Sequence, residues 1–177
     1  MKSLTILLLT LLVTVWAPAQ PLGKTLPEFD FQTVDGENLN LSELRKKSPT
    51  GVVLLTFWCT ECASCRATEE SLAQVTREFA GKAKVVAVAS SKDDTPQTVQ
   101  AYLDKHKTGI EVLMDSKGRF ARYLGVDTTT TTVILDQTGR VRYYGTLKRG
   151  KKFFAVDPLK QVLAKKIVGQ PRGPLYG

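Results

Sequence analysis

The sequence predicts an α/β fold in which one central mixed β-sheet is flanked by helices. Short apolar runs typical of buried strands alternate along the chain with segments of helical periodicity. The connections between successive strands are long enough for crossovers, which predicts a largely parallel sheet covered on both faces. The last two strands are separated only by a tight turn, so we expect them to pair antiparallel.

The length and composition predict a single domain. The chain has 177 residues, of which 42% are hydrophobic and 24% charged, values typical of a globular protein with a proper core. We expect a linker over residues 20–28, one domain over residues 29–169 and a flexible tail over residues 170–177. We expect this domain to be a monomer.

The first nineteen residues have the pattern of a cleaved signal peptide. Lys2 provides a positive start, residues 4–16 are apolar apart from threonines, and Ala17-Pro18-Ala19 fits a cleavage site. Cleavage near Ala19 would leave Gln20 as the first residue. The sequence therefore predicts a periplasmic or secreted protein, in a compartment where disulfides persist.

The formal net charge is +8, and much of the excess lies in residues 148–152 and 160–166. We expect a solvated basic face there, in preference to a patch that attracts acidic partners or membrane surfaces. No basic stretch is interleaved with aromatic residues, and no zinc-finger pattern occurs. We therefore expect no binding of nucleic acid.

The first elements predict an N-terminal β-hairpin extension. Residues 29–34 form the first strand, Asp35-Gly36 is a turn signal, and Leu39 and Leu41 alternate on the returning strand. Ser42 is the expected cap of a short helix over residues 43–47.

The next pair of elements is the most informative in the chain. Residues 51–58 are almost continuously apolar, as in a central strand buried on both faces. The following helix has one inward stripe, which is expected to end near Gly81. The stripe comprises Cys65, Thr68, Leu72, Val75 and Phe79.

The remaining elements complete the alternation. Thr95-Pro96 predicts the start of a helix with Val99, Tyr102, Leu103 and His106 along its apolar face. A final helix is expected from Asp157-Pro158, with inward side chains at Leu159, Val162, Leu163 and Ile167. The other expected elements are strands over residues 85–89, 110–114, 131–135 and 141–143, and a short helix over residues 120–124.

All three cysteines of the chain fall within seven residues. Cys59, Cys62 and Cys65 form a C-x-x-C-x-x-C pattern that begins directly after the central strand. A strand that delivers such a pattern to a helix start indicates a redox site or a metal site. Cys62 is expected at the start of the helix and exposed, whereas Cys65 lies on the inward stripe.

With these residues in place, the sequence resembles exported thioredoxin-like thiol-disulfide oxidoreductases of the TlpA/ResA type, in the wider redoxin and peroxiredoxin-like group. This resemblance implies a thioredoxin-like fold. It covers about residues 29–145, and it rests on motifs at residues 29–44, 57–65, 112–126 and 129–141.

The chain departs from the family pattern at several positions. Thr130, after Thr129, replaces the cis-proline of the loop where family members hold substrate backbone by strand addition. A cis bond before a non-proline residue costs about 2.5–4 kcal/mol, so we expect this loop to be trans or otherwise relaxed. Glu61 and Ser64 replace a tryptophan and a proline around Cys62.

Two further departures concern the cysteine site. Thr68 stands where many relatives have an acid, and Glu69 is expected to point to a different face. Cys59 replaces a small residue and has no role in the family.

The chemistry of thiol–disulfide exchange assigns roles to two cysteines. A thiolate is stabilised at a helix N-terminus, so Cys62 is the expected attacking thiol and Cys65 the resolving thiol. Arg66 should favour the thiolate electrostatically, and Glu61 should oppose it. A purely structural disulfide is the alternative, but so short a loop constrains little of the unfolded chain.

Three interpretations of Cys59 remain open. It is a buried spectator, a second resolving thiol for Cys62, or a metal ligand together with Cys62 and Cys65. Neither a zinc site nor an iron–sulfur run is complete, since the fourth ligand is missing. His106, the only histidine, is expected to be packed or to lie at a helix end.

The leading functional prediction is an exported thiol-disulfide oxidoreductase without a cofactor. Its partners would be thiols and disulfides of cell-envelope proteins, and a membrane protein would be its electron donor. A thiol peroxidase is the second hypothesis, because related peroxidases place a threonine near the reactive cysteine and Thr60 is one residue displaced from that position. A metal-binding or redox-inactive module is the third.

Overall fold

A computed structural model describes residues 21–175 of the chain. Residues 1–20 lie outside the described part, and so does the predicted signal peptide. The helices are α1 (Leu41–Lys46), α2 (Ala63–Glu78), α3 (Pro96–His106), α4 (Arg119–Leu124) and α5 (Val156–Leu163), with a 3₁₀ turn η1 (Ser116–Gly118). The strands are β1 (Asp30–Thr33), β2 (Asn38–Asn40), β3 (Val53–Trp58), β4 (Lys84–Ala89), β5 (Val112–Met114), β6 (Thr131–Leu135), β7 (Val141–Thr146), β8 (Lys148–Arg149) and β9 (Lys152–Phe153).

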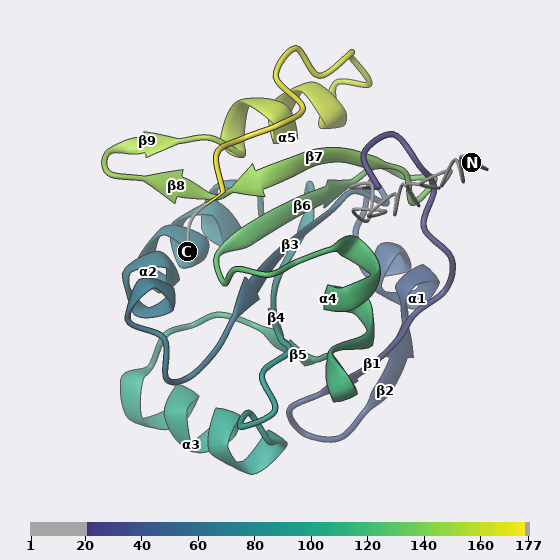
Figure 1. The fold of residues 1–177 in the computed structure, drawn as a ribbon. Coiled ribbons are helices and arrows are strands. Elements are labelled where there is room, and N and C mark those ends of the chain that lie inside the picture. Colours follow the sequence, from purple (N-terminus) through teal and green to yellow (C-terminus); the bar gives the residue numbers. More distant parts are fainter. Residues whose placement is uncertain (1–20, 176–177) are drawn as a thin grey trace, which may run out of the picture.

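The central sheet is mixed, as predicted, and has the strand order β2-β1-β5-β4-β3-β6-β7 (Figure 1). Only β3 with β4 and β4 with β5 pair in parallel, whereas the other neighbouring pairs are antiparallel. The expectation of a largely parallel sheet is therefore wrong. The reason is that a hairpin is added at each end of the parallel core: β1–β2 beside β5, and β6–β7 beside β3.

Two helical layers cover the sheet, each over its own hydrophobic core. Buried residues of α2, α3 and α5 pack on one face, and those of α1 and α4 pack on the other. The central strand β3 serves both cores, because its side chains alternate: Leu54 and Trp58 face the first layer, whereas Leu55 and Phe57 face the second. The buried central strand predicted from the sequence is confirmed.

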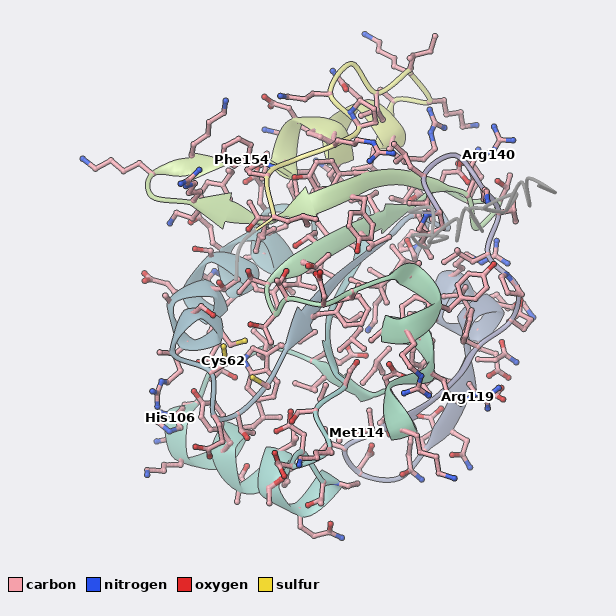
Figure 2. The ribbon with its side chains drawn as sticks, in the orientation of Figure 1. Cys62, His106, Met114, Arg119, Arg140 and Phe154 are labelled. Carbon is pink, nitrogen blue, oxygen red and sulfur yellow. The ribbon has the colours of Figure 1, made fainter. Side chains whose placement is uncertain are left out.

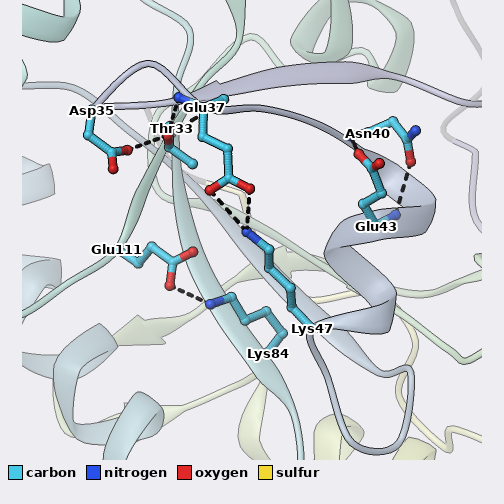
Figure 3. Close-up of polar contacts among 8 residues, drawn as sticks. All are labelled: Thr33, Asp35, Glu37, Asn40, Glu43, Lys47, Lys84 and Glu111. Atoms are coloured by element: carbon cyan, nitrogen blue, oxygen red, sulfur yellow. Dashed lines mark hydrogen bonds and ion pairs between the residues drawn. The ribbon is translucent and has the colours of Figure 1, made fainter.

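The N-terminal hairpin is present, and β1 also joins the central sheet. β1 pairs antiparallel with β2 and, on its other side, with β5. Thr33 donates a hydrogen bond to Asp35 in the connecting turn (Figure 3). The same figure shows ion pairs of Lys47, the C-cap residue of α1, with Glu37 and of Lys84 in β4 with Glu111.

The cap of α1 differs from the prediction. Asn40, not Ser42, is the N-cap residue: its side chain accepts a hydrogen bond from the Glu43 N–H at 2.9 Å. The Glu43 carboxylate accepts in return from the Asn40 N–H at 2.7 Å (Figure 3). This reciprocal capping box explains why the helix starts two residues early.

The predicted start of α3 is confirmed, whereas α5 ends earlier than predicted. Thr95 is the N-cap of α3 with Pro96 at the first position, as predicted. α5 ends at Leu163, and Lys165 adopts a left-handed backbone with φ of 55°. Ile167 therefore lies beyond the helix and is 88% exposed, so its predicted inward position is wrong.

The segment expected to be a linker packs along β7. The Gly23 N–H donates to the Val141 carbonyl at 2.8 Å, and the Leu26 N–H donates to the Gly139 carbonyl at 3.0 Å. Leu26 is buried in the core between the sheet and α1 and α4. Residues 21–26 therefore belong to the folded unit.

The segment expected to be a flexible tail also runs along β7. The Tyr144 N–H donates to the Pro171 carbonyl and the Thr146 N–H to the Pro174 carbonyl, both at 2.9 Å. The Gly173 N–H donates to the Tyr144 carbonyl at 3.0 Å. Residues 171–174 thus occupy the outer edge of β7 in the manner of a further strand.

The basic stretch after β7 folds into a small hairpin, β8–β9, that the sequence did not reveal (Figure 1). The Nζ of Lys148 lies 4.8 Å from the centre of the Phe153 ring, and the Nζ of Lys152 lies 4.7 Å from that of Phe154. In the described part of the chain, every helix is too short or too polar to cross a membrane.

Candidate active site

The three cysteines meet where β3 ends and α2 begins. The buried strand stops at Trp58, and Cys62 is the N-cap residue of α2. One helical turn further on, Cys65 returns beneath the loop, so all three Sγ atoms lie within 4.8 Å of one another. Figure 2 shows Cys62 at the start of α2, with sulfur atoms grouped around it.

Cys65 is fully buried, as its place on the inward stripe predicts. Its Sγ accepts a hydrogen bond from the Cys59 N–H at 3.3 Å and lies 3.8 Å from the Cys59 Sγ. Burial, followed by the nearby thiols of Cys59 and Cys62, raises the pKa of Cys65 well above its ordinary value. Cys65 is therefore a protonated thiol at neutral pH.

Cys62 is half-buried and is surrounded by hydroxyl groups. Its Sγ lies 2.9 Å from the Ser64 Oγ and 3.1 Å from the Thr129 Oγ1. Burial alone would raise the pKa of Cys62, but these two hydroxyls and the N–H and thiol of Cys65 outweigh it and lower the pKa to about 6. Cys62 is thus largely a thiolate at neutral pH.

Cys59 is half-buried and has the opposite tendency. Burial is the largest cause that raises its pKa to about 11, and the negative charge of Cys62 is the next. At neutral pH the site therefore contains one thiolate, at Cys62, and two thiols. Attack by Cys62 requires a thiolate there, and resolution by Cys65 requires a thiol held in reserve, so this distribution suits both roles.

Glu61 and Arg66, to which we assigned an electrostatic role, are both exposed. The principal causes of the Cys62 pKa are burial and the contacts with Ser64, Thr129 and Cys65. The predicted effect of Glu61 and Arg66 is therefore at most secondary. Sequence reasoning singled out Ser64 only as a replacement for proline, and it gave Thr129 only a place in the substrate loop.

The loop that carries Thr129 and Thr130 contains no cis peptide bond, and neither does any other part of residues 21–175. The expected trans loop is confirmed, but it is not relaxed. Thr130 has a φ of 68°, a left-handed conformation that is unfavourable for a β-branched residue. The Thr130 N–H donates to the Phe57 carbonyl at 2.7 Å, which holds the loop against the end of β3.

Asp94, which the sequence did not reveal, fixes the loop between Cys59 and Cys62. Its Oδ1 accepts from the Thr60 N–H at 3.2 Å and from the Thr60 hydroxyl at 2.7 Å. Asp94 is buried, and it lies 34 residues after Thr60 in the chain. The Thr60 hydroxyl thus donates to Asp94, and the peroxidase hypothesis stays a prediction.

Glu69 is a second site residue whose role the sequence did not reveal. Its Oε1 accepts from the indole N–H of Trp58 at 3.0 Å and from the hydroxyl of Tyr102 at 2.9 Å. His106 stacks on Tyr102, with 4.2 Å between ring centres, in the last turn of α3. This agrees with its predicted place at a helix end. The cluster of close potential ligands in the described residues contains the three cysteines and no histidine.

A reactive cysteine at the start of the helix that follows the central strand of a mixed sheet defines a thioredoxin-like redox protein. The family model described as "AhpC/TSA family" matches residues 22–144, so the chain belongs to this family. The resemblance to thioredoxin-like thiol-disulfide oxidoreductases that the sequence motifs predicted is thereby confirmed.

Individual proteins agree with this assignment. The chain is 33% identical over 130 residues to the thioredoxin-like protein YneN of Bacillus subtilis, which covers 72% of this chain and 74% of that protein. It is 29% identical over 133 residues to the thiol:disulfide interchange protein DsbE of Pseudomonas fluorescens, covering 73% and 70%. The crystal structure of a putative DsbE from Chlorobium tepidum has the same fold, with a TM-score of 0.69, 24% identity and coverage of 82% and 99%.

Proposed function

We propose that this protein is an exported thiol-disulfide oxidoreductase that reduces or exchanges disulfides in proteins of the cell envelope. One observation carries the proposal: half-buried Cys62, with a lowered pKa, lies beside buried Cys65, and their two Sγ atoms are within 4.8 Å of each other. The name thiol:disulfide interchange protein, borne by a relative, supports oxidoreductase activity.

The reaction proceeds in two exchanges. The Cys62 thiolate attacks one sulfur of a substrate disulfide, a mixed disulfide forms, and the other substrate sulfur leaves as a thiolate. Cys65 then gives its proton to the substrate thiolate released in the first exchange and attacks the Cys62 sulfur, which releases the second substrate thiolate and leaves a Cys62–Cys65 disulfide. The substrate gains two electrons and the protein loses two. A dithiol donor resets the site.

A substrate chain has a place to lie next to Ser64, whose hydroxyl contacts the Cys62 sulfur. A groove of about 360 Å³ is lined by Ser64 and Thr68 of α2, by Thr130 and by Lys148 of β8. The rim contributed by Lys148 favours substrates with acidic residues near the disulfide. The Thr130 N–H already donates to Phe57, so substrate recognition relies less on this amide than strand addition would require.

Export is the part of the proposal that the first nineteen residues support. If it is right, the protein isolated from the periplasm or medium begins at Gln20, which N-terminal sequencing of the mature protein would show. Recovery of the full chain from the cytoplasm alone would contradict it. A membrane-bound dithiol protein would then be the natural electron donor, because it spans the two compartments.

An insulin-reduction assay with dithiothreitol as the donor tests the activity. We expect Cys62→Ser to abolish catalysis. The double variant Cys59→Ser/Cys65→Ser should accumulate a mixed disulfide with a substrate disulfide, because no second protein thiol remains to release it. Full activity of Cys62→Ser would overturn the proposal.

Metal binding is a second candidate function, because three sulfur atoms within 4.8 Å are close enough to share one ion. A tetrahedral site needs a fourth ligand, which a bound water or a partner would have to provide. Metal analysis of the protein purified without oxygen, beside Cys59→Ser, tests this function. A stoichiometric metal that Cys59→Ser loses would support it, and protein that remains metal-free after incubation with zinc would rule it out.

A further inference from the structure

The third cysteine is placed for an exchange that a two-cysteine site cannot perform. The Sγ of Cys59 lies 3.8 Å from the Sγ of Cys65, and the Cys59 N–H donates to the same Cys65 sulfur. A disulfide bond is about 2.05 Å long, so a side-chain movement of about 2 Å closes a Cys59–Cys65 bond. Cys65 thus has two potential partners, Cys59 and Cys62, within reach.

We propose that the disulfide formed by Cys62 and Cys65 passes on to Cys59 and Cys65, so that the oxidised protein keeps Cys62 as a free thiol. This inference rests on the proposed function, since that function generates the first disulfide. Cys59 then acts neither as a spectator nor as a resolving thiol for Cys62. It acts on Cys65.

The exchange balances without any further reagent. Cys59 loses its proton to water, and its thiolate attacks the Cys65 sulfur of the Cys62–Cys65 disulfide. The Cys59–Cys65 bond forms, the Cys62–Cys65 bond breaks, and the electron pair leaves with Cys62 as its thiolate. The protein remains oxidised by two electrons throughout, and one proton is released.

The surroundings of the three sulfurs favour this direction. The leaving thiolate of Cys62 is received by the hydroxyls of Ser64 and Thr129, at 2.9 and 3.1 Å, at the start of α2. Cys59 has no such hydroxyl contact among the described residues, and its thiolate is the less stable and more nucleophilic of the two. Exchange expels the more stable thiolate more readily.

Solvent can take the proton of Cys59. The cysteine is half-buried and lines a groove of about 250 Å³ together with Phe57, Ser90, Thr128 and Thr129. This groove is lined by different residues from the groove beside Ser64 and Lys148. Cys59 is therefore open to solvent from the groove that it lines.

The exchange adds an activity to the oxidised protein. A free Cys62 thiolate can attack the disulfide of a misfolded protein while Cys65 is held in its bond with Cys59. The mixed disulfide is then released by another thiol of the same substrate, which rearranges the substrate disulfide with no net transfer of electrons. The oxidised form would act as a disulfide isomerase.

Disulfide mapping tests the proposal on the full mature chain. The reduced protein is oxidised with one equivalent of diamide, and free thiols are blocked with N-ethylmaleimide. Cleavage after Lys47, Glu61 and Arg66 separates Cys59 from the peptide with Cys62 and Cys65. We expect the two peptides to stay joined, with the maleimide on Cys62. An internal Cys62–Cys65 disulfide with the maleimide on Cys59, or a Cys59–Cys62 bond, would overturn the proposal.

Two variants complete the experiment. Oxidised Cys59→Ser should lose the maleimide label on Cys62, since Cys62 then stays paired with Cys65. Cys62→Ser should still form the Cys59–Cys65 disulfide with diamide, and failure to form it in the folded variant would contradict the proposal. If insulin reduction depends on Cys62 but the map shows only Cys62–Cys65, this inference fails and the proposed function stands. If Cys62→Ser retains full insulin reduction, the proposed function itself fails.

Discussion

The sulfur of Cys62 is contacted by two hydroxyl groups that reach it from different parts of the chain. Ser64 lies two residues away in α2, whereas Thr129 lies 67 residues away in the loop before β6. A thiolate that accepts hydrogen bonds is stabilised relative to the thiol, which lowers the pKa. Ser64 and Thr129 therefore set the reactivity of this cysteine.

Replacing Thr129 with valine should raise the pKa of Cys62 from about 6 by roughly one unit, since a hydrogen bond to a charged group contributes about 1.5–3 kcal/mol and solvent replaces part of it. The rate of alkylation by iodoacetamide, measured against pH, reports this pKa. Between about pH 5.5 and 7.5, the alkylation rate of Thr129→Val should be lower than that of the wild type. Above pH 9 the two rates should be equal, because Cys62 is a thiolate in both proteins. Thr128→Val is the control, because the Thr128 hydroxyl contacts Thr131 instead. An unchanged profile in Thr129→Val would contradict the role of this hydroxyl.

Thr130 tests whether the proline of related proteins would fit this loop. Proline fixes φ near −65° and has no N–H, whereas Thr130 has a φ of 68° and donates to Phe57. Thr130→Pro should therefore lower the free energy of unfolding, by about 3 kcal/mol in urea titrations. Thr130→Ala keeps the N–H and is the matched control. A Thr130→Pro protein more stable than Thr130→Ala would show that the loop readily adopts another conformation.

At the scale of the elements, Glu69 links α2, β3 and α3, which form one wall of the site. One carboxylate oxygen on α2 accepts from Trp58 of β3 and from Tyr102 of α3. Burial, and next the hydrogen bond that Tyr102 donates to Glu69, raises the pKa of Tyr102 to about 12. The Trp58 and Tyr102 rings also meet edge to face, with centres 5.3 Å apart. Glu69 thus positions α3 against α2 and β3.

Truncating Glu69 to alanine should lower the free energy of unfolding by about 2 kcal/mol, because the indole N–H of buried Trp58 and the hydroxyl of half-buried Tyr102 lose their acceptor. Glu69→Gln retains an acceptor oxygen and should lose clearly less. Glu70→Ala, at an exposed neighbour on the same helix, is the control. Thermal and urea unfolding measure the difference. Equal stability of Glu69→Ala and Glu70→Ala would contradict the joining role.

The elements themselves could be predicted from local patterns, but their contacts could not. The apolar run of β3 and the stripe of α2 placed Cys62 at a helix start and Cys65 inside, as the structure shows. The sequence alone does not decide the cap of α1, because Asn40 and Ser42 are both good caps and only the reciprocal bond with Glu43 selects Asn40. Thr129 and Asp94 could not be assigned to Cys62 and Thr60, since folding alone brings them together.

On the scale of the whole molecule, the two ends of the described chain close the same edge of the sheet. Residues 23–26 pair with one end of β7, and residues 171–174 pair with the other. Gly145 and Gly173 allow this close approach: a Cβ on Gly173 would lie 2.1 Å from the Tyr143 hydroxyl and 3.3 Å from the Gly145 Cα. Tyr143 is buried and donates to the Thr146 carbonyl, so it has little freedom to move.

Gly173→Ala should therefore displace residues 171–174 from β7 and lower the free energy of unfolding by about 1–3 kcal/mol, the usual cost of overpacking. Hydrogen exchange should show faster exchange at the Tyr144 and Thr146 amides, which donate to this segment. Gly169→Ala, where a Cβ finds nothing nearer than 4.0 Å, should leave both measurements unchanged. Unaltered protection of these two amides in Gly173→Ala would contradict the close packing.

Covering β7 has a consequence for how copies of this protein meet. An exposed edge strand offers unpaired N–H and C=O groups to any other strand, and such edges start aggregation. Here one edge of the sheet is occupied by the chain's own end segments, and the other is the three-residue strand β2, which carries Asn38 and Asn40. Neither edge gives a second copy a long template. If its substrates are incompletely folded proteins, as the proposed function allows, this covering would keep their free strands from pairing with the sheet.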